Sequence, residues 1–333
     1  MGTSSSRRPD GLVGVMLPRD LPAWDVLTFA QRAEALGFDQ IWVVEDLGFR
    51  GGLAQAGPVL AATQNIGVGV GILPAGARNV AFAAMELATL AQLFPGRLTA
   101  GIGHGMPDWM KQSGAWPASP LTLLREYTTA LRLLLRGEPG PVDGQYVQTA
   151  GVVLNEIPEI VPPVILGVRR PKSLAIAGQV ADGLLLAEPA APAYIKASME
   201  HAGMVPHTPG THIVTYDAAV VDDDGDAAIE RVRPALTVVS EPAWAAHLDP
   251  LTFGQALRAH REKCPDANSA ARTMPAEWVR ALSIVGTPDQ ARESIRARHA
   301  AGATSVVLIP VGADPSASLG DLARVLPQRD DTP

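Results

Sequence analysis

Short apolar runs alternate with longer amphipathic segments along almost the whole chain. The runs have the length of buried strands, and the segments between them place apolar residues three or four positions apart, which is typical of helices. The predicted strands cover residues 11–17, 38–44, 66–72, 97–102, 163–167, 183–186, 212–221 and 305–310. Because a helix is predicted after each strand, we expect an α/β fold in which a parallel sheet closes into a (β/α)8 TIM barrel with insertions.

The helices between these strands are marked by apolar stripes and by Pro or Gly at their ends. They cover residues 26–36, 52–63, 79–94, 120–137, 172–180, 192–202, 288–302 and 319–326. In the helix over 79–94, we expect Phe82, Met85, Leu90 and Leu93 to face inward.

Two segments do not fit the repeating unit. A pair of short strands is predicted between residues 142 and 154, and residues 226–280 are predicted to form a helical insertion. Residues 1–10 are expected to be a disordered tail. Residues 11–333 are expected to form a single domain, because no internal repeat or low-complexity linker divides them.

The composition argues against several kinds of partner. A formal net charge of −7 over 333 residues leaves no basic footprint for a phosphodiester backbone, so we expect no nucleic-acid partner. No stretch reaches the roughly 18 uncharged apolar residues of a membrane span, and the first apolar run is too short for a secretory signal. We therefore expect a soluble, cytoplasmic protein. We expect no metal site, because Cys264 stands alone and the acidic run 222–226 departs from the spacing of a calcium loop.

The most informative stretch lies where the fourth predicted strand ends. It ends in three alternate glycines, Gly101, Gly103 and Gly105, with His104 among them. Glycine lets a backbone approach a flat ring or a phosphate closely, and the carboxyl ends of barrel strands form a common mouth. We therefore predict a pocket for an anionic cofactor here, with His104 either lining it or holding a structural position.

Cationic residues follow the fifth predicted strand. The segment Gly167-Val168-Arg169-Arg170-Pro171-Lys172-Ser173 leads into a helix, where free backbone N–H groups and three cationic side chains favour a phosphate. The alternative is that Pro171 only begins the helix while the three cationic side chains are solvated.

Two adjacent carboxylates, Glu45 and Asp46, end the second predicted strand. Adjacent strand residues face opposite ways, so one of the two is expected to point into the mouth. That carboxylate is a candidate general acid or a contact to a ring nitrogen of the cofactor. The alternative is a helix cap or an ion pair with Arg50.

Taken together, these segments resemble the luciferase-like monooxygenase superfamily, and within it the branch that uses the deazaflavin coenzyme F420 rather than FMN. The resemblance runs from Gly11 to about Gly312 and is carried by residues 30–46, 67–79, 90–105, 167–173, 181–183 and 285–288. It implies a bulge in the third strand beneath the cofactor ring, often with a non-prolyl cis peptide, which would be Gly71-Ile72 here.

The resemblance also implies where the cofactor lies. The phosphate would rest on the backbone of residues 167–173, and Gly103, His104, Gly105 and Glu188 would lie close to the cofactor. Members of the family are commonly homodimers, so we expect a homodimer.

The resemblance implies an oxidoreductase that moves a hydride between the deazaflavin and a small organic substrate, with Asp46, Glu45 or His104 assisting proton transfer or orienting the ring. Sugar-phosphate dehydrogenases of this branch carry a histidine in place of Asp46 and a glutamate near Met106. The run over residues 45–48 looks closer to reductase-like members that act on folate-type or pterin substrates, or to uncharacterised relatives. The alternatives are an FMN-dependent monooxygenase and a non-catalytic flavin-binding protein.

Overall fold

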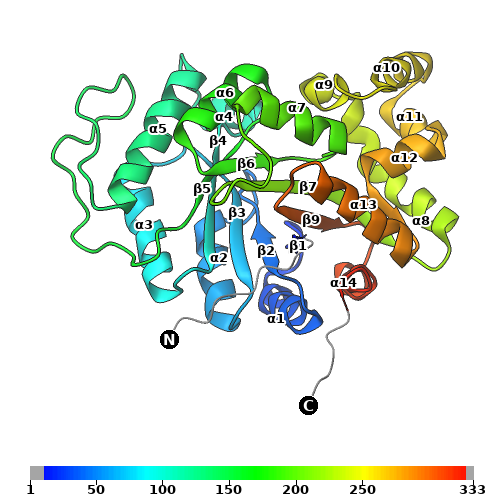
Figure 1. The fold of residues 1–333 in the computed structure, drawn as a ribbon, viewed down its shortest axis with the longest axis horizontal. Coiled ribbons are helices and arrows are strands. Elements are labelled where there is room, and N and C mark those ends of the chain that lie inside the picture. Colours follow the sequence, from blue (N-terminus) through cyan, green and yellow to red (C-terminus); the bar gives the residue numbers. More distant parts are fainter. Residues whose placement is uncertain (1–10, 328–333) are drawn as a thin grey trace.

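Parallel strands close into a barrel in the computed structural model, which describes residues 11–327. The barrel strands are β1 (Leu12–Met16), β2 (Gln40–Val43), β3 (Gly67–Pro74), β4 (Leu98–Gly103), β5 (Val164–Gly167), β6 (Gly183–Leu186), β7 (His212–Val221) and β9 (Ser305–Pro310). They pair in chain order, and the pairings β6–β7, β7–β9 and β9–β1 complete the ring (Figure 1). The predicted (β/α)8 barrel is therefore confirmed.

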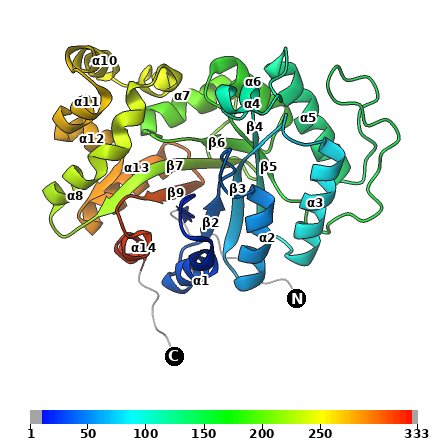
Figure 2. The same ribbon diagram turned by 180° about the vertical axis from the view of Figure 1, so that it is seen from behind.

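Helices surround this barrel on all sides (Figures 1 and 2). They are α1 (Val26–Leu36), α2 (Gly52–Ala62), α3 (Val80–Leu93), α4 (Pro107–Gln112), α5 (Pro120–Leu135), α6 (Pro171–Val180), α7 (Pro192–Ala202), α13 (Pro288–Ala300) and α14 (Pro315–Ala323). No helix in the described part of the chain is long and apolar enough to cross a bilayer.

A short strand, β8 (Ile284–Gly286), lies outside the closed ring and was not predicted. It pairs with Ala219–Val221, the last three residues of β7. The pairing of β7 with β6 ends at Thr215, so the end of β7 extends beyond β6 and leaves an edge that β8 occupies.

The chain between β7 and β8 is helical. It forms α8 (Gly225–Val232), η2 (Arg233–Ser240), η3 (Pro242–Trp244), α9 (Ala245–Leu248), α10 (Gly254–Lys263), α11 (Ala267–Thr273) and α12 (Ala276–Leu282). These helices enclose an apolar cluster of their own that includes Val232, Leu236, Leu257 and Val279. They lie at one end of the barrel, at the upper right of Figure 1.

The strand pair predicted between residues 142 and 154 is wrong. The segment between Leu135 and Val164 contains no helix or strand, and it extends beside α3 and α5 in Figure 1. The backbone N–H groups of residues 145–147 donate to the carboxylate of Glu126 on α5, over distances of 2.8–3.1 Å. These donors are therefore bound to a side chain and do not form a strand ladder.

The inward face predicted for α3 is wrong at three of its four residues. Phe82, Met85 and Leu93 are 64%, 51% and 65% exposed, whereas Leu90 is half-buried and packs against the core as predicted. The buried face consists instead of Val80, Ala83, Ala84, Leu87, Ala88 and Ala91. Both faces of this helix are apolar, so periodicity could not choose between them. The alanine-rich face allows the helix to approach its neighbours more closely.

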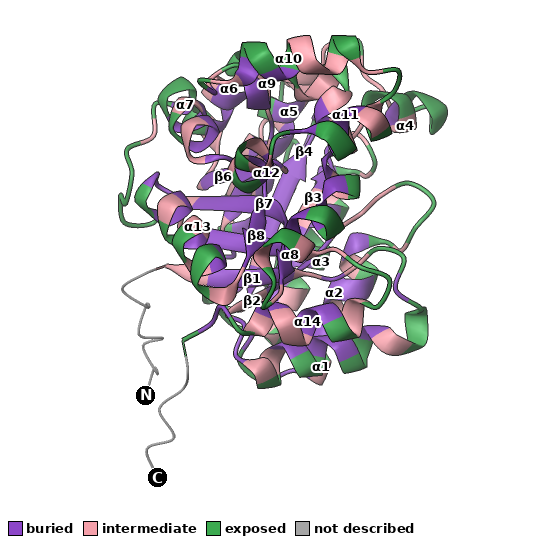
Figure 3. Cartoon of the chain, turned by 90° about the vertical axis from the view of Figure 1, so that its right-hand side faces the viewer, coloured by how far each residue is buried: buried purple, intermediate pink, exposed green. Residues whose placement is uncertain are grey.

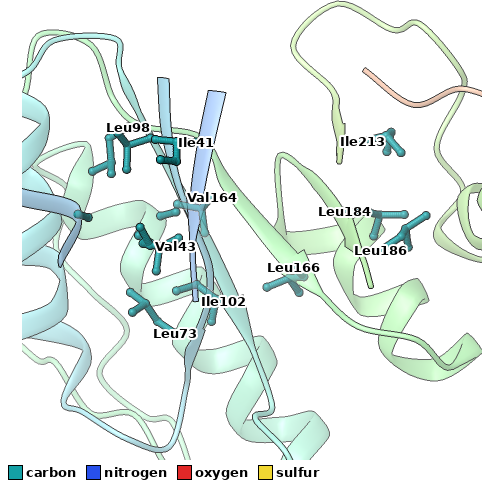
Figure 4. Packing of buried hydrophobic residues seen from close by; sticks show 14 of the residues in the cluster. Ile41, Val43, Leu73, Leu98, Ile102, Val164, Leu166, Leu184, Leu186 and Ile213 are labelled. Carbon is teal, nitrogen blue, oxygen red and sulfur yellow. The ribbon is translucent and has the colours of Figure 1, made fainter. Parts of the chain in front are cut away.

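Side chains on the two faces of the barrel wall form separate clusters. Figure 4 shows the cluster between strands and helices, with Ile41, Val43, Leu73, Ile102, Val164 and Leu166 among its members. Trp42, Ile165, Leu185, Val214, Tyr216 and Val307 fill the barrel interior. The strands are buried while exposed residues gather on the outer faces of the helices (Figure 3). The alternation along β2 places Asp46 on the interior side and Glu45 on the helix side.

Candidate functional site

The floor of the barrel mouth is formed by two large rings. Trp42 of β2 and Tyr216 of β7 meet edge to face, with ring centroids 5.8 Å apart. Glycines on β3 make room for them, because a Cβ on Gly69 would collide with the Trp42 ring and one on Gly71 with the Tyr216 hydroxyl. That hydroxyl is buried and has no hydrogen-bond partner among residues 11–327, and burial raises the pKa of Tyr216 well above its usual value. Tyr216 is therefore a neutral phenol whose hydrogen is available to donate.

Strand β3 bulges directly above this floor. Its register against β4 shifts between Val70 and Leu73, and the Gly71-Ile72 peptide bond is cis. The bulge and the cis bond implied by the resemblance are thus both present.

The side chain of Ile72 then lies against glycines of the next two strands. A Cβ on Gly103 would stand 3.1 Å from Ile72 Cδ1, and one on Gly167 would stand 2.5 Å from Ile72 Cγ2. A Cβ on Gly101 would also crowd Ile72 and would collide with the backbone of Val70. Together, Ile72 and these glycines form an apolar platform with few protruding side chains, which suits a flat ring.

Beside this platform, a side-chain hydrogen bond joins the segment after β4 to the first turn of α6. His104 Nε2 lies 3.1 Å from the hydroxyl of Ser173, which is buried in the first turn of α6. Burial lowers the pKa of His104, so the imidazole is neutral near pH 7. Gly105 follows with φ 72°, a left-handed conformation that favours glycine.

The three cations after β5 have different surroundings. Arg170 and Lys172 are exposed and form no ion pair with any described residue, and no side chain caps the N-terminus of α6. The Arg169 guanidinium instead lies 4.1 Å from the centre of the Trp244 ring, which belongs to the insertion. Burial lowers the pKa of Arg169, and the charge of Glu188 opposes that shift. The α6 terminus therefore fits a phosphate, while Arg169 connects the mouth to the insertion.

Glu45 has two structural contacts. Its Oε2 accepts a hydrogen bond from the backbone N–H of Gly52 at 2.7 Å, at the start of α2. Both of its oxygens lie 2.9 Å from Nη2 of Arg78, in the loop after β3. The helix-capping alternative is therefore observed, with Arg78 as the ion-pair partner. Arg50 donates instead to the backbone carbonyls of Leu21 and Pro18.

Asp46 is paired across the mouth. Its Oδ2 lies 2.6 Å from Nη1 of Arg19, which follows β1. The same guanidinium lies 4.9 Å from the centre of the Phe49 ring. Asp46 is 24% exposed and Arg19 is 50% exposed, so this pair is accessible from solvent.

Glu188 follows β6, two residues after its last residue Leu186, and several hydrogen bonds fix the backbone around it. The Trp244 indole donates to the Glu188 carbonyl at 2.7 Å, and His247 Nδ1 lies 3.1 Å from the Pro189 carbonyl. The backbone N–H of Ala190 donates to Asp217, which forms a buried ion pair with Arg298. Glu188 as a whole residue is half-buried, and burial raises the pKa of its carboxyl.

A cavity of about 270 Å³ opens between α6, α7 and α9. It is lined by Arg169, Tyr194, Ser198, His201 and Asp249 among others. Neither Ile72 nor the platform glycines line this cavity. The candidate site is therefore placed on the platform at the barrel mouth and not in this cavity. Among residues 11–327, no three His, Cys, Asp or Glu side chains gather as metal ligands would.

Sequence reasoning missed Tyr216, Arg78 and Asp217. Tyr216 could have been found from strand alternation, because it stands two positions after the interior residue Val214. Nothing in the local sequence marks Arg78 or Asp217, since their roles depend on partners distant in the chain.

Comparison with known proteins adds a family and several relatives. A family model described as luciferase-like monooxygenase matches residues 11–305. A 5,10-methylenetetrahydromethanopterin reductase of Archaeoglobus fulgidus is 27% identical over 92% of this chain and 96% of its own length. An F420-dependent glucose-6-phosphate dehydrogenase of Nocardia farcinica is 28% identical over 79% of this chain and 78% of its own. The solved coenzyme F420-dependent tetrahydromethanopterin reductase of Methanopyrus kandleri superposes with a TM-score of 0.78 at 21% identity, covering 95% and 98% of the two chains.

Proposed function

The chain belongs to the luciferase-like monooxygenase family, and from this premise we propose that it is an oxidoreductase that uses coenzyme F420, a deazaflavin. The observation that carries the proposal is the platform of Ile72 and Gly101, Gly103 and Gly167 beside the uncapped N-terminus of α6. It offers a flat apolar surface and an anion site next to each other, as a ring with a phosphate-bearing tail requires.

The residues at the mouth divide between the ring and the tail of the cofactor in this proposal. Gly71, Ile72, Gly103 and Gly105 would hold the ring, with His104 and Glu188 at its edges. The segment 167–173 would bind the phosphate through backbone N–H groups and the side chains of Arg170, Lys172 and Ser173. When bound, a deazaflavin supplies a hydride donor or acceptor at C5, and the protein supplies position and electrostatics.

For the substrate, we propose a reduced pterin or folate that carries a one-carbon unit. The Archaeoglobus reductase, whose name states such a substrate, aligns with almost the whole of this chain. The chain also has Asp46 where sugar-phosphate dehydrogenases of the branch have a histidine, and Met106 near their glutamate. Both features favour a reductase over a sugar-phosphate dehydrogenase.

Cofactor titration tests the proposal directly. Purified protein would be titrated with F420 and, separately, with FMN while cofactor absorbance and fluorescence are recorded. We expect saturable binding of F420 and weaker binding of FMN. Binding of FMN alone would contradict the cofactor assignment.

The two rival functions differ in their reactions. An FMN-dependent monooxygenase would consume oxygen when given reduced FMN and substrate. A non-catalytic flavin-binding protein would bind cofactor but would neither reduce methylenetetrahydromethanopterin or methylenetetrahydrofolate nor oxidise their products.

We also propose that the protein is a homodimer. Phe82, Met85 and Leu93 form an exposed apolar stripe along α3. Ile157 and Ile160 of the loop after α5 are also exposed, and Gln92 of α3 donates to the carbonyl of the neighbouring Glu156. An apolar patch of this kind on a monomer is typical of an interface.

A further inference from the structure

We propose that Glu188 is the residue that exchanges a proton with the substrate. The inference rests on the proposed function and goes beyond it, because it gives to Glu188 the role that sequence analysis offered to Glu45, Asp46 or His104.

The other acidic groups near the mouth are already engaged. Glu45 caps α2 and binds Arg78, Asp46 binds Arg19, and Asp217 accepts two hydrogen bonds from Arg298. Among residues 11–327, the Glu188 carboxyl accepts a hydrogen bond only from its own backbone N–H. It is therefore the carboxyl at the mouth whose lone pairs and proton remain available to a ligand.

The backbone around Glu188 is fixed more firmly than its side chain. Trp244 and His247 of the insertion hold the Glu188 and Pro189 carbonyls, and Asp217 holds the N–H of Ala190. Three separate elements thus fix the segment that carries this carboxyl, which has no side-chain hydrogen-bond partner in the described part of the chain. A proton donor must be held in place by a rigid backbone, and its carboxyl must be free to contact the substrate.

The charges around Glu188 favour its protonated form. Burial is the largest cause and raises its pKa, and the charges of Asp217 on β7 and Asp46 after β2 add to this effect, while the hydrogen bond from its own backbone N–H and the charge of Arg169 after β5 lower it. Arg169 lies over the Trp244 ring, and the buried His247 of the insertion is neutral because burial lowers its pKa to about 3. Tyr216 beneath the bulge is also neutral. Glu188 therefore keeps its proton at a pH where an exposed glutamate has lost it.

The step balances with no further reactant. In the reducing direction, the methylene carbon that bridges two nitrogens of the substrate gains the hydride as one of its C–N bonds breaks, and the released nitrogen gains the proton of Glu188. The carboxyl O–H bond breaks as the new N–H bond forms, and water reprotonates the resulting carboxylate. In the oxidising direction, the carboxylate accepts the proton.

The protonation state can be tested without a substrate. Infrared difference spectra of the protein would be recorded across a pH titration, in the wild type, in Glu188→Gln and in Glu200→Gln, which alters an exposed glutamate of α7. We expect a protonated-carboxyl band that titrates above the range of ordinary glutamates, that is lost in Glu188→Gln and that persists in Glu200→Gln. Persistence of every such band in Glu188→Gln would overturn the proposal.

The catalytic role is tested with the cofactor bound and with methylenetetrahydromethanopterin and methylenetetrahydrofolate as probes. We expect Glu188→Gln to bind F420 as the wild type does and to lower kcat by about 10²–10⁴-fold with little change in KM. In the reducing direction, we expect the wild-type rate to fall as the pH rises, and we expect this fall to disappear in Glu188→Gln. An unchanged kcat and pH profile would overturn the role of Glu188 alone, whereas failure of the wild type to bind F420 would overturn the proposed function as well.

Discussion

Asp217 and Arg298 form an ion pair that is closed off from water, with side chains 0% and 2% exposed. Two hydrogen bonds of 2.8 and 2.9 Å join them. Removing one partner would leave the other charge buried and uncompensated, so we expect Arg298→Met to lower the free energy of unfolding by about 3–5 kcal/mol. Denaturant unfolding measures this change.

Arg258→Met is the matched control. Its pair with Asp249 is exposed, so this substitution should lower the free energy of unfolding by less than about 1 kcal/mol. Equal losses in the two variants would contradict the prediction.

The buried His247 makes the free energy of unfolding depend on pH. Burial lowers its pKa to about 3, below the value of about 6.5 that it has in the unfolded chain. The unfolded state therefore binds more protons between these values, and stability falls as the pH falls through this window. As the pH falls from 6.5 to 5, protonation of His247 in the unfolded chain should lower the free energy of unfolding by about 2 kcal/mol. In His247→Phe, which retains a ring beside Tyr194, that part of the slope should vanish in denaturant titrations. A variant with the wild-type slope would show that other groups cause it.

The positions of individual side chains at the mouth were only partly predictable. Strand alternation predicts that Glu45 and Asp46 face opposite sides, and in the structure they have different partners: Glu45 binds the start of α2 and Arg78, and Asp46 binds Arg19 after β1. Their partners, Arg78 and Arg19, lie 33 and 27 residues away. Such pairings depend on how loops from different β/α units meet, which no local pattern records.

At the scale of elements, the bulge of β3 depends on glycine. A Cβ on Gly71 would collide with the Tyr216 hydroxyl and stand 2.7 Å from Leu185 Cδ1. We expect Gly71→Ala to displace the bulge and to weaken F420 binding at least about tenfold, or 1.4 kcal/mol, as measured by fluorescence titration. In the double variant Gly71→Ala/Tyr216→Phe, part of the collision is removed and binding should recover partly.

Gly67 supplies the control for this prediction in the same strand. A Cβ there would meet Gln40 Cγ at 3.4 Å, an ordinary contact. Gly67→Ala should therefore leave F420 affinity unchanged. If both alanine variants bound F420 like the wild type, the platform would not be the ring site.

The elements themselves were predictable to different degrees. Strand and helix periodicity predicted the barrel because burial on both faces gives parallel strands short, continuous apolar runs. It failed for the loop over 142–154, where Glu126 takes the backbone donors, and for α3, where both faces are apolar. It also placed the last helix at 319–326, whereas Asp314 caps α14 and the helix begins at Pro315.

At the scale of the molecule, the barrel and the insertion meet at the proposed site. Arg169 and Glu188 stand at the ends of β5 and β6, and Trp244 of the insertion contacts both. The eight-strand ring follows from a pattern repeated along the sequence, whereas this contact depends on how the helical segment folds back over the mouth. Sequence could therefore predict the mouth and its glycines but not the side chains that frame Glu188.

The assembly of the molecule can be tested on the exposed stripe of α3. In a two-fold symmetric dimer each substitution occurs twice, so its effect on association is doubled. We expect Phe82→Glu/Leu93→Glu to weaken dimerisation by at least about 100-fold, which would give monomers in sedimentation velocity at micromolar concentration. Trp24→Glu is the control, because Trp24 is 81% exposed but precedes α1 and lies outside the stripe. A wild-type chain that sediments as a monomer, or a dimer lost only in Trp24→Glu, would contradict the assignment of this face.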